Sequence, residues 1–150
     1  LQDIYFAEKQ IVKALPKMMK KTDSPELGKA FESHLAETEE QVTRLEQVFE
    51  MLGEKPKATK CPAIEGIIEE ANELIADIQD PDTRDAGMIA AAQAVEHYEI
   101  TRYGTLVSWA ELLRMKDAAK VLGQTLKEEY GADQKLTKLA ESRLNKEAAE

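Results

Sequence analysis

Four predicted helical segments of this chain each place a carboxylate in a row of positions that should be apolar. Glu8, Glu99 and Glu129 lie near the centres of their rows, and Glu37 lies at the edge of a fourth. Burying an unpaired carboxylate costs several kcal/mol, so a carboxylate in a helical core needs a partner cation. Several carboxylates that converge on the centre of one bundle therefore indicate a metal site.

The apolar spacing of three and four residues predicts four long helices and one short helix. The long helices span about residues 1–20, 25–52, 81–115 and 117–146, and the short one about 63–79. Ser24 before Pro25 is typical of a helix start, and Gly53 of a helix end. Two short links predict antiparallel hairpins, and the connection of about thirty residues allows an overhand crossover. We therefore expect an all-α, ferritin-like four-helix bundle with a short extra helix in the crossover, as a single domain over residues 1–150.

Composition and charge argue against several classes of protein. A net charge of −9 means that the chain has no excess of positive charge to neutralise phosphates, so we expect no nucleic-acid partner. No apolar run reaches the ~18 residues of a membrane-spanning helix, and no signal-peptide pattern opens the chain. The single cysteine, Cys61, cannot form an internal disulfide. We therefore expect a cytoplasmic protein without a membrane partner, and further residues before Leu1, which is not a methionine.

Helical geometry predicts that the carboxylates lie at a common level. Residues equally distant from the turn of an antiparallel hairpin share a height, which sets Glu8 beside residue 38 and Glu99 beside residue 133. Glu96 and Glu99 are three residues apart, and Glu129 and Asp133 are four apart, so each pair shares one helix face. The predicted metal ligands are Glu8, Glu37, Glu96, Glu99, Glu129 and Asp133. These pairs could grip one ion or bridge two, and oxygen ligands with almost no histidine favour iron, or manganese, over zinc.

An inward carboxylate can also be held by a lysine or a tyrosine, without a metal. This interpretation is the stronger one for Glu37 alone and the weaker one for the whole set, because the available cations point outward. Those cations are Lys9, Arg102 and Lys135. His34 lies nearer the centre of its apolar row than Glu37 but one turn away in height, and we expect a core histidine bonded to a neighbouring helix there more than a ligand. Gln41 is expected to support the ligands by hydrogen bonding, and Glu128 is a reserve ligand.

Stretches along nearly the whole chain carry a family resemblance. They lie at residues 1–10, 34–38, 45–49, 95–100, 103–106 and 125–129. On these stretches the chain resembles the YciE/YciF family of ferritin-like bacterial stress proteins, which is similar to rubrerythrins and bacterioferritins. The resemblance implies a four-helix bundle with a di-iron-type centre.

The chain departs from related di-iron proteins at two positions. Those proteins carry a Glu-x-x-His motif on the second and fourth long helices. Here Glu40 follows Glu37 and Ala132 follows Glu129 at that spacing, so both histidines are missing. A rubredoxin-type set of cysteines is also missing, so the chain has no built-in electron donor of that kind.

Two functions from different classes follow from these features. The first is a di-metal protein of the bacterial stress response that handles iron or oxidants by ferroxidase-like or peroxidase-like chemistry. Its expected terminal ligands are Glu8 and Glu129, its bridging ligands Glu37 and Glu99, and its remaining ligands Glu96 and Asp133. The alternative, which the missing histidines favour, is a non-catalytic structural or interaction protein with a vestigial metal site. In either case Val107 and Trp109, on opposite flanks of their apolar row, predict a homodimer.

Overall fold

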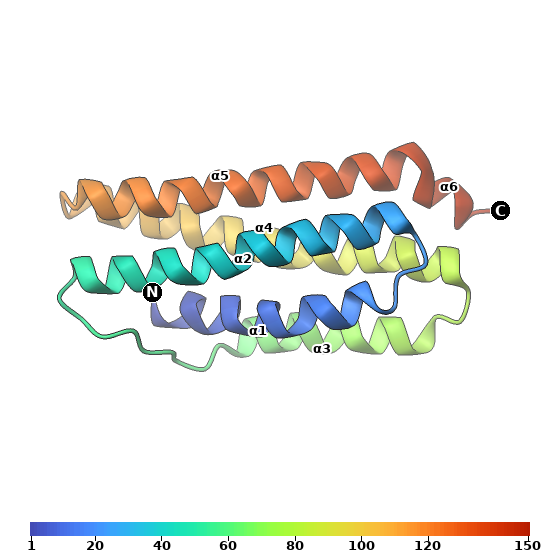
Figure 1. The fold of residues 1–150 in the computed structure, drawn as a ribbon, viewed down its shortest axis with the longest axis horizontal. Coiled ribbons are helices and arrows are strands. Elements are labelled where there is room, and N and C mark those ends of the chain that lie inside the picture. The colour runs from blue at the N-terminus through green and yellow to red at the C-terminus, as the bar shows by residue number, and fades with distance from the viewer.

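A computed structural model describes residues 1–150, and its regular structure is entirely helical (Figure 1). The five long elements are α1 (Gln2–Met19), α2 (Pro25–Met51), α3 (Pro62–Asp77), α4 (Pro81–Leu112) and α5 (Lys116–Leu139). A π-helical turn (Ala140–Leu144) and the short α6 (Asn145–Glu147) end the chain. The predicted all-α class is confirmed, and each predicted helix overlaps an observed one.

Local sequence signals explain where the helices begin and end. The Ser24 hydroxyl accepts a hydrogen bond from the Leu27 amide at 3.3 Å, and Asp80 accepts one from the Thr83 amide at 2.8 Å. In both cases a proline follows in the first turn, where its missing N–H has no intrahelical partner to lose. Gly53, just past α2, has a φ of 70°, which only glycine adopts without strain.

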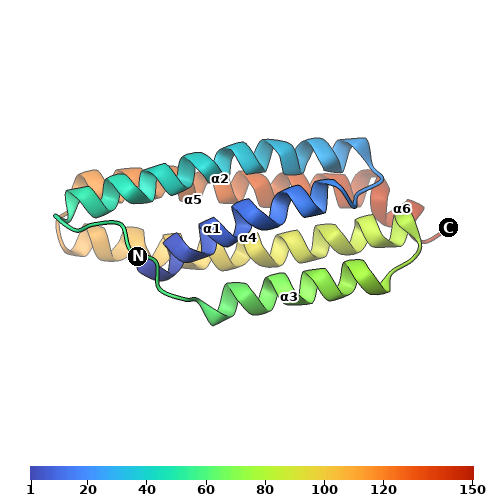
Figure 2. The ribbon, with the colours of Figure 1, turned by 60° about the horizontal axis from the view of Figure 1, so that its bottom comes forward.

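The helices pack as two hairpins with α3 added on the outside. α1 packs on α2, α4 packs on α5, and α2 contacts α5. α1 and α4 touch over only a short stretch, and α3 lies along both of them, over the groove between them (Figure 2). Apolar side chains from all five helices fill the interior; they include Ile4, Leu15, Leu27, Phe31, Leu45, Ile64, Met88 and Leu122. Burial of each such side chain contributes about 1.5–3 kcal/mol, which makes this core the main source of stability.

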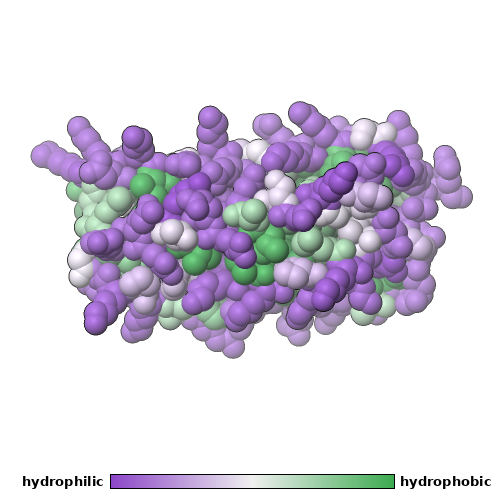
Figure 3. Space-filling view, viewed as in Figure 1, coloured by the Kyte–Doolittle hydropathy of each residue, from purple (hydrophilic) through white to green (hydrophobic).

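The surface is largely charged. Figure 3 shows one face covered mostly by hydrophilic residues, with hydrophobic groups in small separate patches. No helix combines the length and the apolar character that crossing a membrane requires.

A buried aspartate joins the two hairpins at one end of the molecule. Asp85, near the start of α4, accepts hydrogen bonds from the backbone amides of Ser24 at 2.6 Å and Asp23 at 3.1 Å. These amides belong to the turn between α1 and α2. Next to it, Arg84 pairs with the Asp23 carboxylate at 2.5 Å. The first hairpin is therefore anchored to the first turn of α4.

We predict that Asp85→Ala destabilises the protein by about 1–3 kcal/mol, because it leaves the buried Ser24 amide and the partly buried Asp23 amide without an acceptor. Urea-induced unfolding followed by circular dichroism measures this loss. Asp77→Ala, at an exposed position at the end of α3, is the matched control and should change stability little. Equal stability of the two variants would show that the anchor contributes nothing.

Candidate metal centre

Four glutamates from three helices meet in the interior of the bundle. Glu8 comes from α1, Glu96 and Glu99 from α4, and Glu129 from α5. None is more than 2% exposed. Each occupies a position in the apolar stripe of its helix, so packing of the neighbouring Ile, Leu and Ala residues carries the carboxylates inward.

The second long helix, α2, adds a histidine to this cluster. One ligand atom from each of His34, Glu96, Glu99 and Glu129 lies within 4.8 Å of all the others, and all four side chains are buried. His34 Nε2 lies 3.2 Å from Glu96 Oε1. Glu8 adjoins the same group, because its carboxyl interacts directly with Glu99. The cluster therefore draws on α1, α2, α4 and α5.

Many polar atoms of the cluster have no hydrogen-bond partner in the protein. They are both oxygens of Glu99, both ring nitrogens of His34, and Oε2 of Glu8, Glu96 and Glu129. Buried side-chain polar atoms are nearly always hydrogen-bonded, so such a concentration is unusual. Carboxylate oxygens and an imidazole that converge without partners are the donor set of a metal cation. The residues present therefore fit a metal site.

Hydrogen bonds from outside the cluster orient two of the carboxylates. The Tyr103 hydroxyl donates to Glu8 Oε1, and the Gln41 side-chain amide donates to Glu129 Oε1. Gln41 also donates to Glu128 at 3.2 Å, and Arg44 pairs with that Glu128 carboxylate at 2.5 Å. These contacts leave one oxygen of Glu8 and one of Glu129 free, while fixing the direction in which each points.

The electrostatics of the cluster oppose ionisation of its carboxyls. Burial, followed by the charge of Glu129, raises the pKa of Glu8 from 4.5 to about 8. Burial and the neighbouring carboxylates also raise the pKa of Glu96 and Glu99 well above 4.5, and burial raises the pKa of Glu129. No lysine or arginine pairs with any of these four side chains. A bound cation would replace the protons that the metal-free cluster holds.

Comparison with known proteins places the chain in a family. The family model described as "Domain of unknown function (DUF892)" matches residues 1–149. The chain belongs to the DUF892 family. It is 50% identical to the protein YciF of Escherichia coli strain K12 over 149 residues, which are 99% of this chain and 90% of that protein. The resemblance to YciF predicted from the sequence is thus confirmed.

Two solved structures of DUF892 relatives agree with this fold. The crystal structure of the E. coli stress protein YciF has a TM-score of 0.92 at 50% identity, with 97% of this chain and 92% of that chain covered. YcfI of Rhodopseudomonas palustris, described as a candidate structural protein, has a TM-score of 0.89 at 51% identity, with 91% and 87% covered. The backbone that carries the glutamate cluster therefore resembles that of two relatives.

Two of the predicted ligands lie at the margin of the cluster. Glu37 is about one-third exposed and lies 3.8 Å from His34 Nδ1 and 3.5 Å from Lys135 Nζ. Contact with His34, then with Lys135, holds the pKa of Glu37 below its ordinary value. Asp133 accepts a hydrogen bond from Gln93 at 3.0 Å and lies 3.2 Å from His97 Nε2. Both carboxylates therefore already have partners outside the cluster.

Sequence reasoning underrated two side chains that contact the cluster. His34 was expected to bond a neighbouring helix as a core residue, and it does approach Glu96 of α4, but both its nitrogens remain without a hydrogen bond. Its central position in the apolar stripe was the available signal. The sequence predicted no role for Tyr103, because nothing in it distinguishes a tyrosine whose hydroxyl meets a buried carboxylate.

The raised pKa values predict that the metal-free protein loses stability as pH rises. Below the ordinary pKa of 4.5, Glu8 is protonated in both the folded and unfolded states. Between pH 4.5 and about 8 the unfolded chain has lost a proton that the fold still holds, so the free energy of unfolding falls. Each pH unit in this window costs about 1.4 kcal/mol for a fully shifted group.

Chemical unfolding from pH 5 to pH 8 in the presence of a chelator measures this slope. Glu8→Gln should lessen it, because the amide does not titrate, while Glu96, Glu99 and Glu129 keep part of the slope. The exposed substitution Glu111→Gln should keep the original slope. A metal-free protein that grows more stable toward pH 8 would contradict the assignment.

Proposed function

We propose that this chain is a ferritin-like protein that forms a single domain and binds two iron ions, with manganese as an alternative, among the buried glutamates. The two antiparallel hairpins and the long connection that carries α3 support the ferritin-like arrangement. One observation carries the proposal: carboxylate and imidazole atoms from four helices converge in the interior, and most of them have no hydrogen-bond partner in the protein. Kinship with the E. coli stress protein YciF supports a role under stress. Within that role we propose iron or oxidant handling, from the chemistry of the cluster, and a cytoplasmic location.

The arrangement of free atoms suggests a role for each residue. Glu99 has both oxygens free and is the residue best suited to bridge two ions. Glu8 and Glu129 each offer one free oxygen and suit terminal positions, while Glu96 and His34 offer further donors. Glu37 and Asp133 would join a two-ion site only by giving up their present contacts with Lys135 and Gln93.

The protein's own side chains would hold the site in order and keep it dry. Iron, when bound, supplies electron transfer to oxygen or peroxide. Tyr103 and Gln41 keep Glu8 and Glu129 aimed at the centre through their hydrogen bonds. Complete burial of Glu8, Glu99 and Glu129 excludes bulk water and strengthens every charge interaction inside the cluster.

We predict that protein purified without chelator contains iron or manganese, and that the double variant Glu99→Gln, Glu129→Gln does not. Each glutamine keeps the shape of its glutamate and removes the negative charge. Elemental analysis measures the metal content. Ferrous ion added without oxygen should also raise the melting temperature, because metal at a hundredfold excess over its dissociation constant stabilises by about 2.7 kcal/mol.

The control is a double variant at exposed positions, Glu111→Gln, Glu141→Gln, which keeps the same change in net charge. It should retain both the metal and the thermal shift. Equal metal content in the two double variants would refute the proposed site.

A structural or interaction protein with a vestigial site is the second proposal, and a specific observation favours it. Exposed apolar side chains gather at one end of the molecule: Trp109 and Leu112 at the end of α4, Leu113 after it, and Met51 and Leu52 at the end of α2 (Figure 1). The description of the relative YcfI agrees with such a role. Ferrous oxidation well above the buffer rate would exclude this second proposal.

The same apolar end supports the proposal of a homodimer. Trp109 is 59% exposed, Leu112 80% and Leu113 69%. The added helix α3 lies along α1 and α4 and leaves this end uncovered. Pairing of two identical patches about a twofold axis is the commonest way to bury such a surface.

We predict a mass of twice the 16.8 kDa of the chain by light scattering at micromolar concentration. Trp109→Ser should shift the protein toward the monomer, because it removes the largest apolar side chain of the patch. Tyr130→Ser, at an exposed aromatic position on α5, should leave the mass unchanged. A monomer, or a large cage, for the unmodified chain would contradict the dimer.

A further inference from the structure

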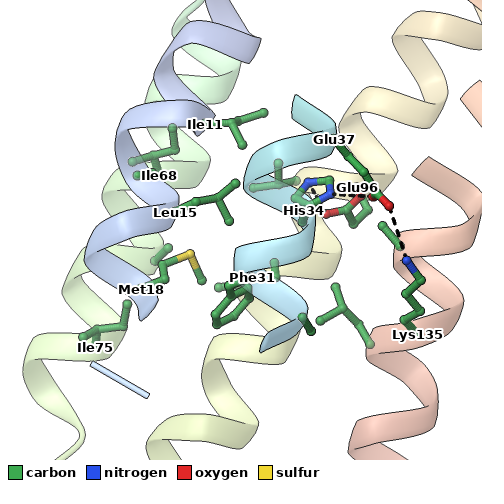
Figure 4. Close-up of a pocket in the computed structure, with 18 of the residues that line it drawn as sticks. Ile11, Leu15, Met18, Phe31, His34, Glu37, Ile68, Ile75, Glu96 and Lys135 are labelled. Carbon is green, nitrogen blue, oxygen red and sulfur yellow. Dashed lines mark hydrogen bonds and ion pairs between the residues drawn. The ribbon is translucent and has the colours of Figure 1, made fainter. Parts of the chain in front are cut away.

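An apolar cavity lies beside the glutamate cluster and shares two of its residues. Most of its lining side chains are hydrophobic and come from all five long helices. Ile11, Leu15, Phe31 and Ile68 are among them (Figure 4). His34 and Glu96 also belong to the lining, so the cavity reaches the two residues that bring α2 and α4 together in the cluster.

The packing of the helices explains why a cavity exists at this place. α1 and α4 touch over only a short stretch, and α3 covers the groove between them. Several residues that face the groove are alanines, which leave space that a larger side chain would fill; they include Ala14, Ala71, Ala91 and Ala92. Figure 4 shows α1 and α3 on one side of the space and His34 and Glu96 on the other.

Size and polarity narrow the choice of occupant. The cavity has a volume of about 50 Å³. A cavity needs roughly 10–15 Å³ to hold one water molecule, and an apolar cavity of roughly 150 Å³ binds benzene or xenon while excluding water. The present cavity is too small for a drug-sized or fatty ligand. Most of its walls are apolar and offer water no partner, and its polar lining is limited to His34, Glu37, Asn72, Glu96 and Lys135. A small apolar molecule of two or three atoms fits both limits.

We propose that this cavity binds dioxygen next to the candidate metal centre. Its apolar part would hold the gas, and His34 and Glu96 line the cavity and also belong to the cluster. The role of the bound gas rests on the proposed function, but binding itself depends only on the cavity. Binding can therefore be measured on the metal-free protein.

The test is methyl NMR of the metal-free protein under oxygen pressure, since paramagnetic dioxygen accelerates the relaxation of methyl groups that it touches. Methyls of Ile11 and Leu15 should relax several-fold faster than the methyls of Leu45, which is also buried but lies outside the cavity. Enhancement equal to that of Leu45 would overturn the proposal, because the cavity would then be filled by water or collapsed.

Two variants and a control test whether the enhanced methyl relaxation comes from oxygen in this cavity. Ala71→Leu places an isobutyl group in the cavity from α3, and Ala92→Val adds two methyl groups from α4 in case α3 moves outward. Both should abolish the extra relaxation. Ala110→Leu, at a similarly buried alanine away from the cavity, should retain it. Enhancement that persists in both cavity variants would refute the assignment.

Oxygen consumption with ferrous iron separates this proposal from the proposed function. If both hold, the rate falls several-fold in Ala71→Leu and not in Ala110→Leu, while iron content stays the same in both. An absence of oxygen consumption in every protein, together with intact oxygen binding by NMR, would refute only the oxidative role in the proposed function. An unchanged rate in both cavity variants would refute delivery of oxygen through this cavity.

Discussion

Burial of four carboxyl groups in one place is the interaction on which the rest of this structure depends. The effective penalty for burying an ionised carboxylate is several kcal/mol, and a folded protein has a net stability of only about 5–15 kcal/mol. The cost of burying four charged and unpaired glutamates would therefore equal or exceed the whole net stability of the fold. The fold is compatible with this cluster only if the carboxyls are protonated or share a cation. The pKa values of Glu8, Glu96, Glu99 and Glu129 are raised, which means that without a cation these carboxyls hold their protons more tightly than usual.

Much of the fold was predictable because its signals are local. Ser24 with Pro25 and Asp80 with Pro81 mark the starts of α2 and α4, and periodic apolar residues define the helix faces. The burial of Glu8, Glu99 and Glu129 followed from the same periodicity, since each lies close to the centre of its stripe. Side-chain partners were harder to predict. Glu37 and Asp133 lie off the stripe centres, where a small rotation decides between the interior and a surface partner such as Lys135 or Gln93.

His34 illustrates a different limit. A histidine in an apolar stripe is most simply a core residue, and the usual Glu-x-x-His order would have placed the imidazole after Glu37. In this chain His34 comes three residues before Glu37, so the imidazole occupies the interior while Glu37 turns toward Lys135. Only the approach of the imidazole to Glu96 of α4 distinguishes this arrangement from an ordinary core histidine. The donor set is accordingly richer in oxygen than that of the di-iron proteins with two such motifs.

The contact between Asp85 and the turn at residues 23–24 has a consequence far from its own position. Glu99 lies 14 residues along α4 from Asp85, roughly 21 Å away at 1.5 Å per residue. A slip of the first hairpin by a single residue would lower Glu8 against Glu99 by about 1.5 Å, which exceeds the tolerance of metal coordination. The buried aspartate thus works as an axial stop. By fixing the height of the first hairpin at one end of the bundle, it keeps the ligands at the centre aligned.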